Sequence, residues 1–598
     1  MEIEVYNVQK YFLFKLPDLL NNAYHIFEEK RVESIKLSIT LCIDTFEEMN
    51  SSSIGTDKLE KSYKSLLCSL AFQLKKHPFY SLPQFKKDFE QVIKMIGATE
   101  CEKNYELYMC LKTLRKKFKS QNICALYIEC LQRKMKYGEI DILIEAFVSD
   151  LLYMGYALPY LAEWYTRQMR ESGLYKEINE KNLEQCINSL LQLNGEKRQY
   201  EIIIPYQIKS ENERKSAEQF LGKHFVLKTK EDFNRYGDEW KWTEDTYAVK
   251  KCEASDHYRA INIVKKEFDT DKELLSMCQN DTDVIHENYQ VGYIVQDKVH
   301  RVDIRKVTNI RLISFYDEAR TKQYNIFIEL KDKMKNEDVD VLERVLHTLH
   351  TAKSYNIQNR FLNFWSALEY TIYPFPKNSI IEKARVLVSE SFTLFYIKDK
   401  MNIFWKRLNY TMKKKNAEFE HAECKKFLDE CIEDDGFNTL KFIEILQDES
   451  KYMGLLTDLS FHVVLEREAR ELIMLVTQPE KVREILVDYH DSIVHDLDCI
   501  YRLRNQLIHS AKGMDDSLED ISLRLYRYVN SIIATILYYK KRNPEVSIIE
   551  ILNSLHNTYE MYMEHLKSIK KDVLIPSQMG NAVEEGYKIV RPRYLFLE

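Results

Sequence analysis

The sequence predicts a mainly α-helical, multi-domain protein in which a small α+β region separates two helical regions. Glycine and proline, which interrupt helices, number only 14 and 11 among the 598 residues, whereas average proteins contain about 12% of the two together. Apolar residues recur at steps of three and four in the first and last parts of the chain, as they do in amphipathic helices. A chain of this length is expected to form about three to four domains.

The N-terminal region, over residues 1–195, is expected to form a helical domain. The stretches "LEKSYKSLLCSLAFQL" from Leu59 and "YELYMCLKTLRKKF" from Tyr105 both have the spacing of amphipathic helices. A further helical stretch begins at Asp150. This region therefore accounts for about the first third of the chain.

The middle region, over residues 196–335, is expected to form a small α+β domain. Its helical part is the stretch that begins at Asp256. Short runs rich in β-branched and aromatic residues predict strands. These runs are "YEIIIPYQI" from Tyr200, "HFVLKT" from His224, "YQVGYIVQD" from Tyr289 and "YNIFIEL" from Tyr324.

The helical pattern returns over residues 336–572, which we expect to form a C-terminal helical bundle. The stretch that begins at Asp340 fits either one long helix or two. Clear helical patterns follow from Asp491 and from Ser517. Residues 573–598 contain several glycines and prolines and are expected to form an extended tail.

Charge and composition exclude several classes of protein. The formal net charge is −6, so any contact with RNA must come from local basic patches. The spacing of the cysteines does not indicate a set of disulfide bonds, and the spacing of His421, Cys424 and Cys431 is not that of a zinc site. We therefore expect a cytoplasmic protein in which these are ordinary side chains, and no cofactor is expected, because the sequence has neither a P-loop nor a dinucleotide fingerprint. The start of the chain lacks the pattern of a signal peptide, and no apolar run reaches the roughly 18 residues of a membrane span.

One short stretch concentrates groups that bind phosphate. In "YRLRNQLIHSAKG", which begins at Tyr501, Arg502, Asn505 and His509 share one side of a helical wheel. Arg504 lies about 140° from His509 on that wheel, although it can reach the same point through its long, flexible side chain, or if the last turn unwinds. Cations are also favoured at any helix end by the helix dipole. Spacing alone thus fits both an ordinary helix end and a phosphate site.

Two segments of the C-terminal region resemble a known family. "RNQLIH" resembles the signature of HEPN domains, in which an arginine, often followed by asparagine, precedes a histidine by four to six residues. "QNRFLNFWSALEYTI", from Gln358, resembles the arginine, tryptophan and "ALE" pattern of the large ApeA-like HEPN proteins, and it lies upstream as in that group. The resemblance covers residues 340–570 and implies a helical-bundle ribonuclease that works without a metal as a homodimer.

The resemblance also implies roles for individual residues. His509 would act as a general base or acid, Arg504 would stabilise charge on the phosphate, and Asn505 would orient the phosphate or the histidine. Arg502 is a rival for the arginine role because its spacing to His509 also fits, although the arginine–asparagine order favours Arg504. Glu369, in the "ALE" segment, either braces the active-site arginine or histidine or is an ordinary surface glutamate.

These roles predict an endoribonuclease that leaves 2′,3′-cyclic phosphate and 5′-hydroxyl ends. We expect its partner to be RNA, with tRNA among the candidates, and its setting to be antiviral defence, as an abortive-infection or toxin effector. The activating ligand or phage protein is not identified by the sequence. The alternative is a catalytically silent HEPN-like scaffold that binds RNA or protein.

Other basic and histidine-rich stretches have ordinary explanations. The basic runs from Lys112 and from Trp405 can each be a solvated helix face, which is the commoner case. His347 and His350 could share a metal ion, but no third ligand residue lies near them at the spacing of a metal site. For the second basic run, RNA binding is the alternative, and its candidate residues are Lys406, Arg407, Lys413, Lys414 and Lys415. The sequence does not decide whether His490 and His495 contribute to the site.

Overall fold

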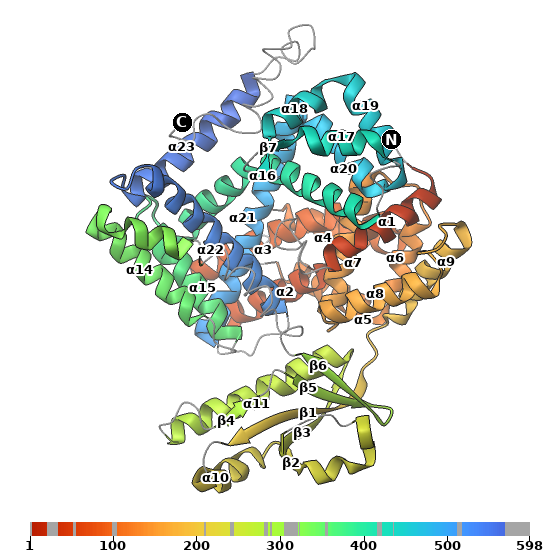
Figure 1. Ribbon diagram of the computed structural model, residues 1–598, viewed down its shortest axis with the longest axis vertical. Helices are drawn as coiled ribbons and strands as arrows, with labels where there is room; N and C mark the ends of the chain where they lie inside the picture. Colours follow the sequence, from red (N-terminus) through yellow and green to blue (C-terminus); the bar gives the residue numbers. More distant parts are fainter. Residues whose placement is uncertain are drawn as a thin grey trace.

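The computed structural model has the mainly α-helical fold that the sequence predicts, with a small antiparallel sheet in its middle region and a two-stranded one, β7 (Ile432–Glu433) with β8 (Gly436–Phe437), among the C-terminal helices (Figure 1). The tail predicted over residues 573–598 lies outside the described residues. The structure describes residues 3–20, 34–51, 56–98, 104–208, 211–239, 244–279, 285–287, 290–303, 321, 323–352, 357–415, 421–433, 436–510 and 517–568.

The N-terminal region is helical, as predicted. Asn104, Asn122 and Asn179 each precede a helix, and the side-chain oxygen of each accepts a hydrogen bond from a backbone N–H of the first turn. The helices are α1 (Val5–Leu20), α2 (Ile35–Ser51), α3 (Thr56–Lys76), η1 (Pro78–Ser81), α4 (Pro83–Ile96), α5 (Tyr105–Ser120), α6 (Ile123–Leu131), α7 (Tyr137–Tyr153), α8 (Leu158–Glu171), α9 (Glu180–Ser189) and η3 (Leu190–Gln192).

The middle region contains the sheet. Its strands run in the order β2-β3-β1-β5-β6, with β4 also paired to β1, and every pairing is antiparallel. The elements are β1 (Arg198–Ile208), α10 (Glu211–Leu221), β2 (Val226–Thr229), η4 (Lys230–Glu239), β3 (Thr246–Ala254), α11 (His257–Gln279), β4 (Ile285–Glu287), β5 (Gln290–Val295) and β6 (Lys298–Asp303).

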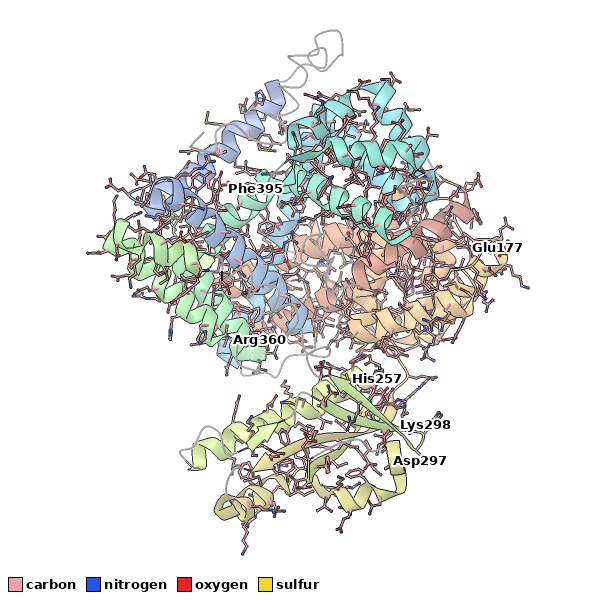
Figure 2. The ribbon with its side chains drawn as sticks, viewed as in Figure 1. Glu177, His257, Asp297, Lys298, Arg360 and Phe395 are labelled. Carbon is pink, nitrogen blue, oxygen red and sulfur yellow. The ribbon has the colours of Figure 1, made fainter. Side chains whose placement is uncertain are left out.

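The alternation of side chains along β1 gives the sheet two buried faces. Ile202 and Ile204 pack with α11 residues such as Val264, whereas Ile203 packs with Phe233 on the opposite face. The turn between β5 and β6 has positive φ at Gln296 and Asp297 (Asp297 is labelled in Figure 2). Positive φ at both central residues is the geometry of a two-residue hairpin with a type I′ turn.

One predicted strand is wrong. Residues 323–330, which include "YNIFIEL", are helical. Phe327 and Leu330 are buried three residues apart in the core of the helical body, whereas Tyr324 and Ile328 are exposed. This burial follows the period of a helix, and the segment joins the helical body because its apolar side packs there.

The C-terminal region is a helical bundle, and the stretch from Asp340 forms two helices, not one. In Figure 1, α15 lies beside α14 and α22, with which it is in contact. The elements are η5 (Lys331–Lys333), α14 (Asn336–Thr351), α15 (Ile357–Ile372), α16 (Ile380–Lys415), α17 (Ala422–Glu430), β7 (Ile432–Glu433), β8 (Gly436–Phe437), α18 (Thr439–Gln447), α19 (Glu449–Asp458), η7 (Leu459–Phe461), α20 (Val463–Thr477), α21 (Pro479–Ser510), α22 (Ser517–Arg542) and α23 (Ile548–Ser568).

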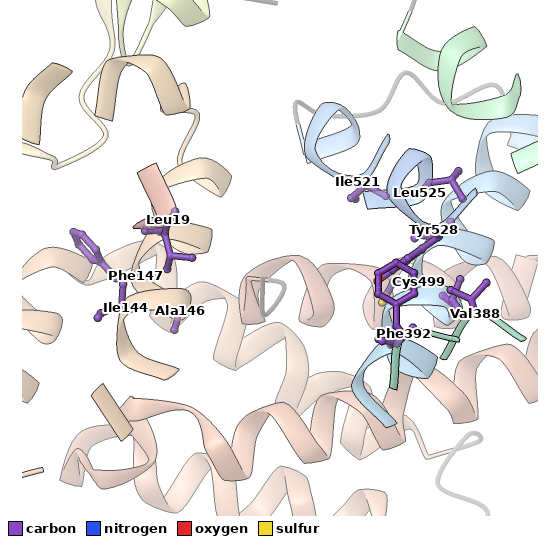
Figure 3. Close-up of a cluster of buried hydrophobic side chains, with 14 of the residues drawn as sticks. Leu19, Ile144, Ala146, Phe147, Val388, Phe392, Cys499, Ile521, Leu525 and Tyr528 are labelled. Atoms are coloured by element: carbon purple, nitrogen blue, oxygen red, sulfur yellow. The ribbon is translucent and has the colours of Figure 1, made fainter. Parts of the chain in front are cut away.

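The two helical regions share one continuous hydrophobic core, although the α+β region separates them in sequence. Figure 3 shows two parts of this core: Leu19 and Phe147 from the N-terminal helices, and Val388 and Leu525 from the C-terminal helices. Helix α1 packs against α20, and α3 packs against α21. The sheet has its own clusters of buried residues. Within the described parts of the chain, none of the helices has the length and apolar character needed to cross a membrane.

The α+β region meets the helical body at the start of α11. Figure 2 shows His257 on the side of this region that faces the helical body, and its ring packs edge-on against Tyr160 of α8 at 5.8 Å. Asp256 is fully buried beside it and accepts hydrogen bonds from the backbone N–H groups of Ala157, at 2.7 Å, and Arg259, at 2.8 Å. Burial raises the pKa of Asp256 to about 7.

Replacing Asp256 by asparagine is expected to change how stability depends on pH. The carboxyl of an unfolded chain has a pKa of about 3.9, whereas in the fold it is about 7, so the fold favours the protonated form. The resulting stabilisation is complete below pH ~4 and is lost as the pH rises toward about 7. Relative to the variant, the free energy of unfolding of the wild type should fall by a few kcal/mol over this window, at roughly 1.4 kcal/mol for each unit by which the pKa is raised.

The midpoint of urea denaturation as a function of pH measures this difference. Asp245→Asn, at an exposed position just before β3, is the matched control and should follow the wild type. Parallel pH curves for the wild type and Asp256→Asn would contradict the prediction.

Candidate functional site

The two segments that resemble HEPN proteins are in contact. The first forms α15 and the second forms the end of α21. Phe361 and Leu368 of α15, like Ile500 and Leu503 of α21, are fully buried in the shared core. The ring of Trp365 lies 5.5 Å from that of Tyr501, at an angle of 42°. This packing fixes the rotation of both helices about their axes and therefore the direction of their polar side chains.

Arg504 and Glu369 face one another across this contact. The distance from Nη2 of Arg504 to Oε1 of Glu369 is 3.6 Å, and the side chains are 25% and 27% exposed. The indole Nε1 of Trp365 donates a 2.5 Å hydrogen bond to the same carboxylate oxygen. The buried tryptophan thus holds Glu369 in place beside the arginine, in the bracing position that the sequence left open.

Asn505 contacts the same guanidinium. Nη1 of Arg504 donates to Oδ1 of Asn505 at 3.2 Å. An arginine has five N–H donors in a fixed planar arrangement, so these two contacts orient the group without occupying all of its donors. The remaining donors suit the oxygens of a phosphate.

Arg502, the rival arginine, lies in a different environment. Its side chain is only 4% exposed, and its Nη2 donates a 2.5 Å hydrogen bond to Oε2 of Glu48 in α2. The helical wheel placed Arg502 on the side of His509, but α2 covers that side of α21 at this level. Sequence reasoning missed Glu48 because nothing local marks a partner that lies so far away in the sequence.

His509 belongs to the last turn of α21, but its side chain lies outside the described part of the structure, as do residues 511–516, which include Gly513. The backbone is helical from Arg504 to Ser510, so the last turn does not unwind. Arg504 and His509 are therefore separated by about 7.5 Å along the helix axis and about 140° around it.

The two upstream histidines lie away from Arg504. His490 stacks on Tyr559 of α23 with ring centroids 5.3 Å apart, and His495 packs against Phe72 of α3 at 5.5 Å. His495 precedes Arg504 by roughly 13 Å along the helix, and His490 lies further upstream. The structure does not bring either histidine to the contact between α15 and α21.

The second basic run needs a correction. Arg407 is buried and forms ion pairs with Glu468 and with Asp18, the latter at 3.2 Å. It therefore does not lie on a surface that RNA can reach. Lys406 and Lys413 are exposed, and the side chains of Lys414 and Lys415 lie outside the described residues.

The position of this run along α16 also separates it from the site. Arg385 of α16 pairs with Asp498 of α21, with its Nη2 2.5 Å from Oδ1, and Tyr396 packs against Tyr489 at 4.4 Å. The two helices are therefore antiparallel. Lys406 lies roughly 30 Å along α16 beyond Arg385, in the direction away from Arg504.

The other histidines and cysteines form no arrangement of the kind that holds a metal. His347 and His350 are exposed on α14. Burial raises the pKa of the Cys424 and Cys431 thiols to about 12. Across the described ranges, no three His, Cys, Asp or Glu side chains are placed to hold an ion together.

Replacing Glu48 by alanine is expected to destabilise the helical body by about 2 kcal/mol, because it leaves the buried guanidinium of Arg502 without its carboxylate. Glu343→Ala is a matched control, because Glu343 pairs with Lys331 where both side chains are exposed and such pairs contribute about 0–1 kcal/mol. Urea denaturation followed by circular dichroism compares the two. Equal midpoints for both variants would show that Arg502 does not need Glu48.

Comparison of the chain with protein-family models, with curated proteins and with solved structures finds no match. Any relation to HEPN proteins therefore depends on the two motif segments and on the contacts that join them.

Proposed function

We propose that the protein is a metal-independent endoribonuclease whose site includes Arg504, Asn505 and His509, with Glu369 as a positioning residue. The observation that carries the proposal is the contact between α15 and α21. The two segments that resemble HEPN proteins meet there, and the partly exposed Arg504 is paired with Glu369 at 3.6 Å. The burial of Arg502 supports Arg504 as the arginine that meets the phosphate.

These residue types suit a cleavage reaction in which the RNA supplies its own nucleophile, the 2′-oxygen. The 2′-oxygen attacks the adjacent phosphorus, and the bond from phosphorus to the 5′-oxygen breaks. One imidazole accepts the proton of the 2′-hydroxyl, and an imidazolium donates a proton to the leaving 5′-oxygen. Arg504 stabilises the charge that grows on the phosphate oxygens. The products are a 2′,3′-cyclic phosphate and a 5′-hydroxyl.

A homodimer would supply both proton transfers. Within one chain, the backbone positions of Arg504 and His509 lie about 140° apart around the helix axis, because α21 stays helical between them. A second copy of the helix end can place its own histidine on the other side of the phosphate. We therefore propose that two copies of the C-terminal bundle form the complete site.

The same resemblance supports a role in antiviral defence, as a toxin or abortive-infection effector that cuts cytoplasmic RNA such as tRNA. Unrestrained cleavage would harm the host cell, so the N-terminal and α+β regions would restrain the site until a phage protein or another ligand releases it. No described contact identifies that trigger.

Arg504→Ala and His509→Ala are each expected to lower the rate of RNA cleavage by about 100-fold or more, as expected when a charge-stabilising or proton-transfer group is removed. Lys481→Ala, an exposed cation near the start of the same helix, is the matched control and should keep full activity. The assay uses the purified full chain with end-labelled RNA and a chelator.

The products and the substrate sugar test the mechanism. Cyclic phosphate ends should form, and a single 2′-deoxy substitution should block cleavage at that linkage. Cleavage that survives in both variants, or products with 3′-hydroxyl ends, would refute the proposed site. Absence of any cleavage by the wild type would favour the silent scaffold.

Glu369→Gln is expected to lower kcat by roughly 10-fold with little change in KM, because the neutral amide no longer fixes the guanidinium. Trp365→Phe removes the N–H donor together with part of the buried ring system, so it should give a smaller loss of kcat but a lower melting temperature. The melting temperature of Glu369→Gln should stay close to that of the wild type. A fall in the apparent kcat that only matches a loss of folded protein would argue against a positioning role.

A further inference from the structure

One face of α5 carries a row of cations and an exposed aromatic ring. Tyr105, Lys112, Lys116 and Lys119 recur at helical spacing along this face, with Arg115 beside them. Tyr105 is 63% exposed, and Lys116 and Lys119 are exposed. We call these five residues the α5 basic face.

The charge of this face is largely uncompensated. Lys112 pairs with Glu47 at 3.0 Å. For Arg115, Lys116 and Lys119, the structure shows no ion pair with any residue that it describes. By contrast, Lys117, on the side of α5 that meets α4, is paired with Asp88 at 2.6 Å. A solvated helix face was the ordinary explanation for this run, but a row of four cations beside one carboxylate attracts polyanions.

The last turn of α2 joins the α5 basic face to the end of α21. Glu47 accepts a 2.6 Å hydrogen bond from Tyr108 of α5, and the next residue, Glu48, accepts one from Arg502 of α21 at 2.5 Å. Two consecutive residues of α2 thus reach both helices. The basic face therefore begins about one helix diameter from α21 at the level of Arg502, on the side of that helix opposite to Arg504.

The aromatic part of the face lies at the end nearest to α21. Tyr105 packs against Tyr108 with ring centroids 5.4 Å apart and against Phe46 at 6.4 Å, so an exposed ring rests on a buried support. Lys112 lies over the ring of Tyr108 at 4.5 Å. Surfaces that bind single-stranded nucleic acid combine such cations for the backbone with an aromatic platform for a base.

We propose that the α5 basic face binds single-stranded RNA, with phosphates along Lys112, Lys116 and Lys119 and an unpaired base on Tyr105, and leads the strand to the end of α21. The choice of RNA over other polyanions rests on the proposed nuclease function. A base-paired strand would not offer Tyr105 a free base, so the single-stranded form is the one that uses the whole face.

Equilibrium binding of a labelled oligouridylate RNA to the full chain tests the proposal, by fluorescence anisotropy in the His509→Ala background so that the RNA stays intact. The double variant Lys116→Gln/Lys119→Gln should weaken binding by roughly 25-fold at about 0.1 M salt. It should also make the plot of log affinity against log salt concentration shallower by about 1.4, because each phosphate contact on a single strand contributes about 0.7 to that slope. Tyr105→Ala should weaken binding by about 5-fold or more, with no effect on a duplex RNA.

The matched control is Lys87→Gln/Lys94→Gln, which removes the same charge from exposed positions on the neighbouring α4; it should change the affinity by less than about 2-fold. Equal losses from both double variants would reduce the effect to net charge and overturn the proposal. Three other results would also overturn the proposal. They are an unchanged affinity in Lys116→Gln/Lys119→Gln, no RNA binding by the parent chain, and binding of polyglutamate that depends on the same two lysines.

The outcome is separable from that of the nuclease proposal. Binding that depends on the α5 basic face in a chain that never cuts RNA would uphold this inference and refute the nuclease. Cleavage by the wild type with unchanged kcat/KM in Lys116→Gln/Lys119→Gln would uphold the nuclease and overturn this inference.

Discussion

The arrangement of charged groups in this protein depends on how α21 is surrounded. The helix packs against α3, α15, α16, α20 and α23, so successive polar residues along it meet different neighbours. Asp496 accepts hydrogen bonds from Arg524 and Tyr528 of α22, whereas Asp498 pairs with Arg385 of α16. A charge inside a bundle is costly unless it is paired, and here each pairing also ties α21 to one more helix.

The end of α21 is where this coverage becomes incomplete. Arg502 is still enclosed by α2 and paired with Glu48, but Arg504, half a turn later, is only partly covered by α15. Its guanidinium is oriented by Glu369, which is in turn held by the indole of Trp365. A cation that is fixed before a phosphate arrives stabilises developing charge without reorganising, and its partial exposure leaves it open to a ligand.

The N-terminal helices take part in this arrangement instead of forming a separate module. They share one core with the C-terminal bundle, and α2 supplies the partner of Arg502 while also contacting α5. The α+β region is attached differently. It has its own buried clusters, and its junction with the helical body includes the buried carboxylate of Asp256. A change in that region would reach the candidate site only through the helical body.

Local sequence patterns were sufficient for the class of fold and for many of the helices, but they did not mark the strands β3, β4 and β6. Helical spacing and the scarcity of glycine and proline predicted the helices, and β-branched runs predicted the strands at β1, β2 and β5. The same reasoning failed for residues 323–330, where the apolar side found its place in the helical core. The two motif segments were also visible in the sequence, because their residues are local.

Tertiary structure decided which residues those patterns expose and bring together. A helical wheel groups side chains on one face, but it does not say which neighbour covers that face. It therefore did not reveal that α2 buries Arg502, that Arg407 is paired inside the body, or that Glu369 meets Arg504. These outcomes depend on contacts between residues far apart in the chain, and such contacts form only when the helices pack.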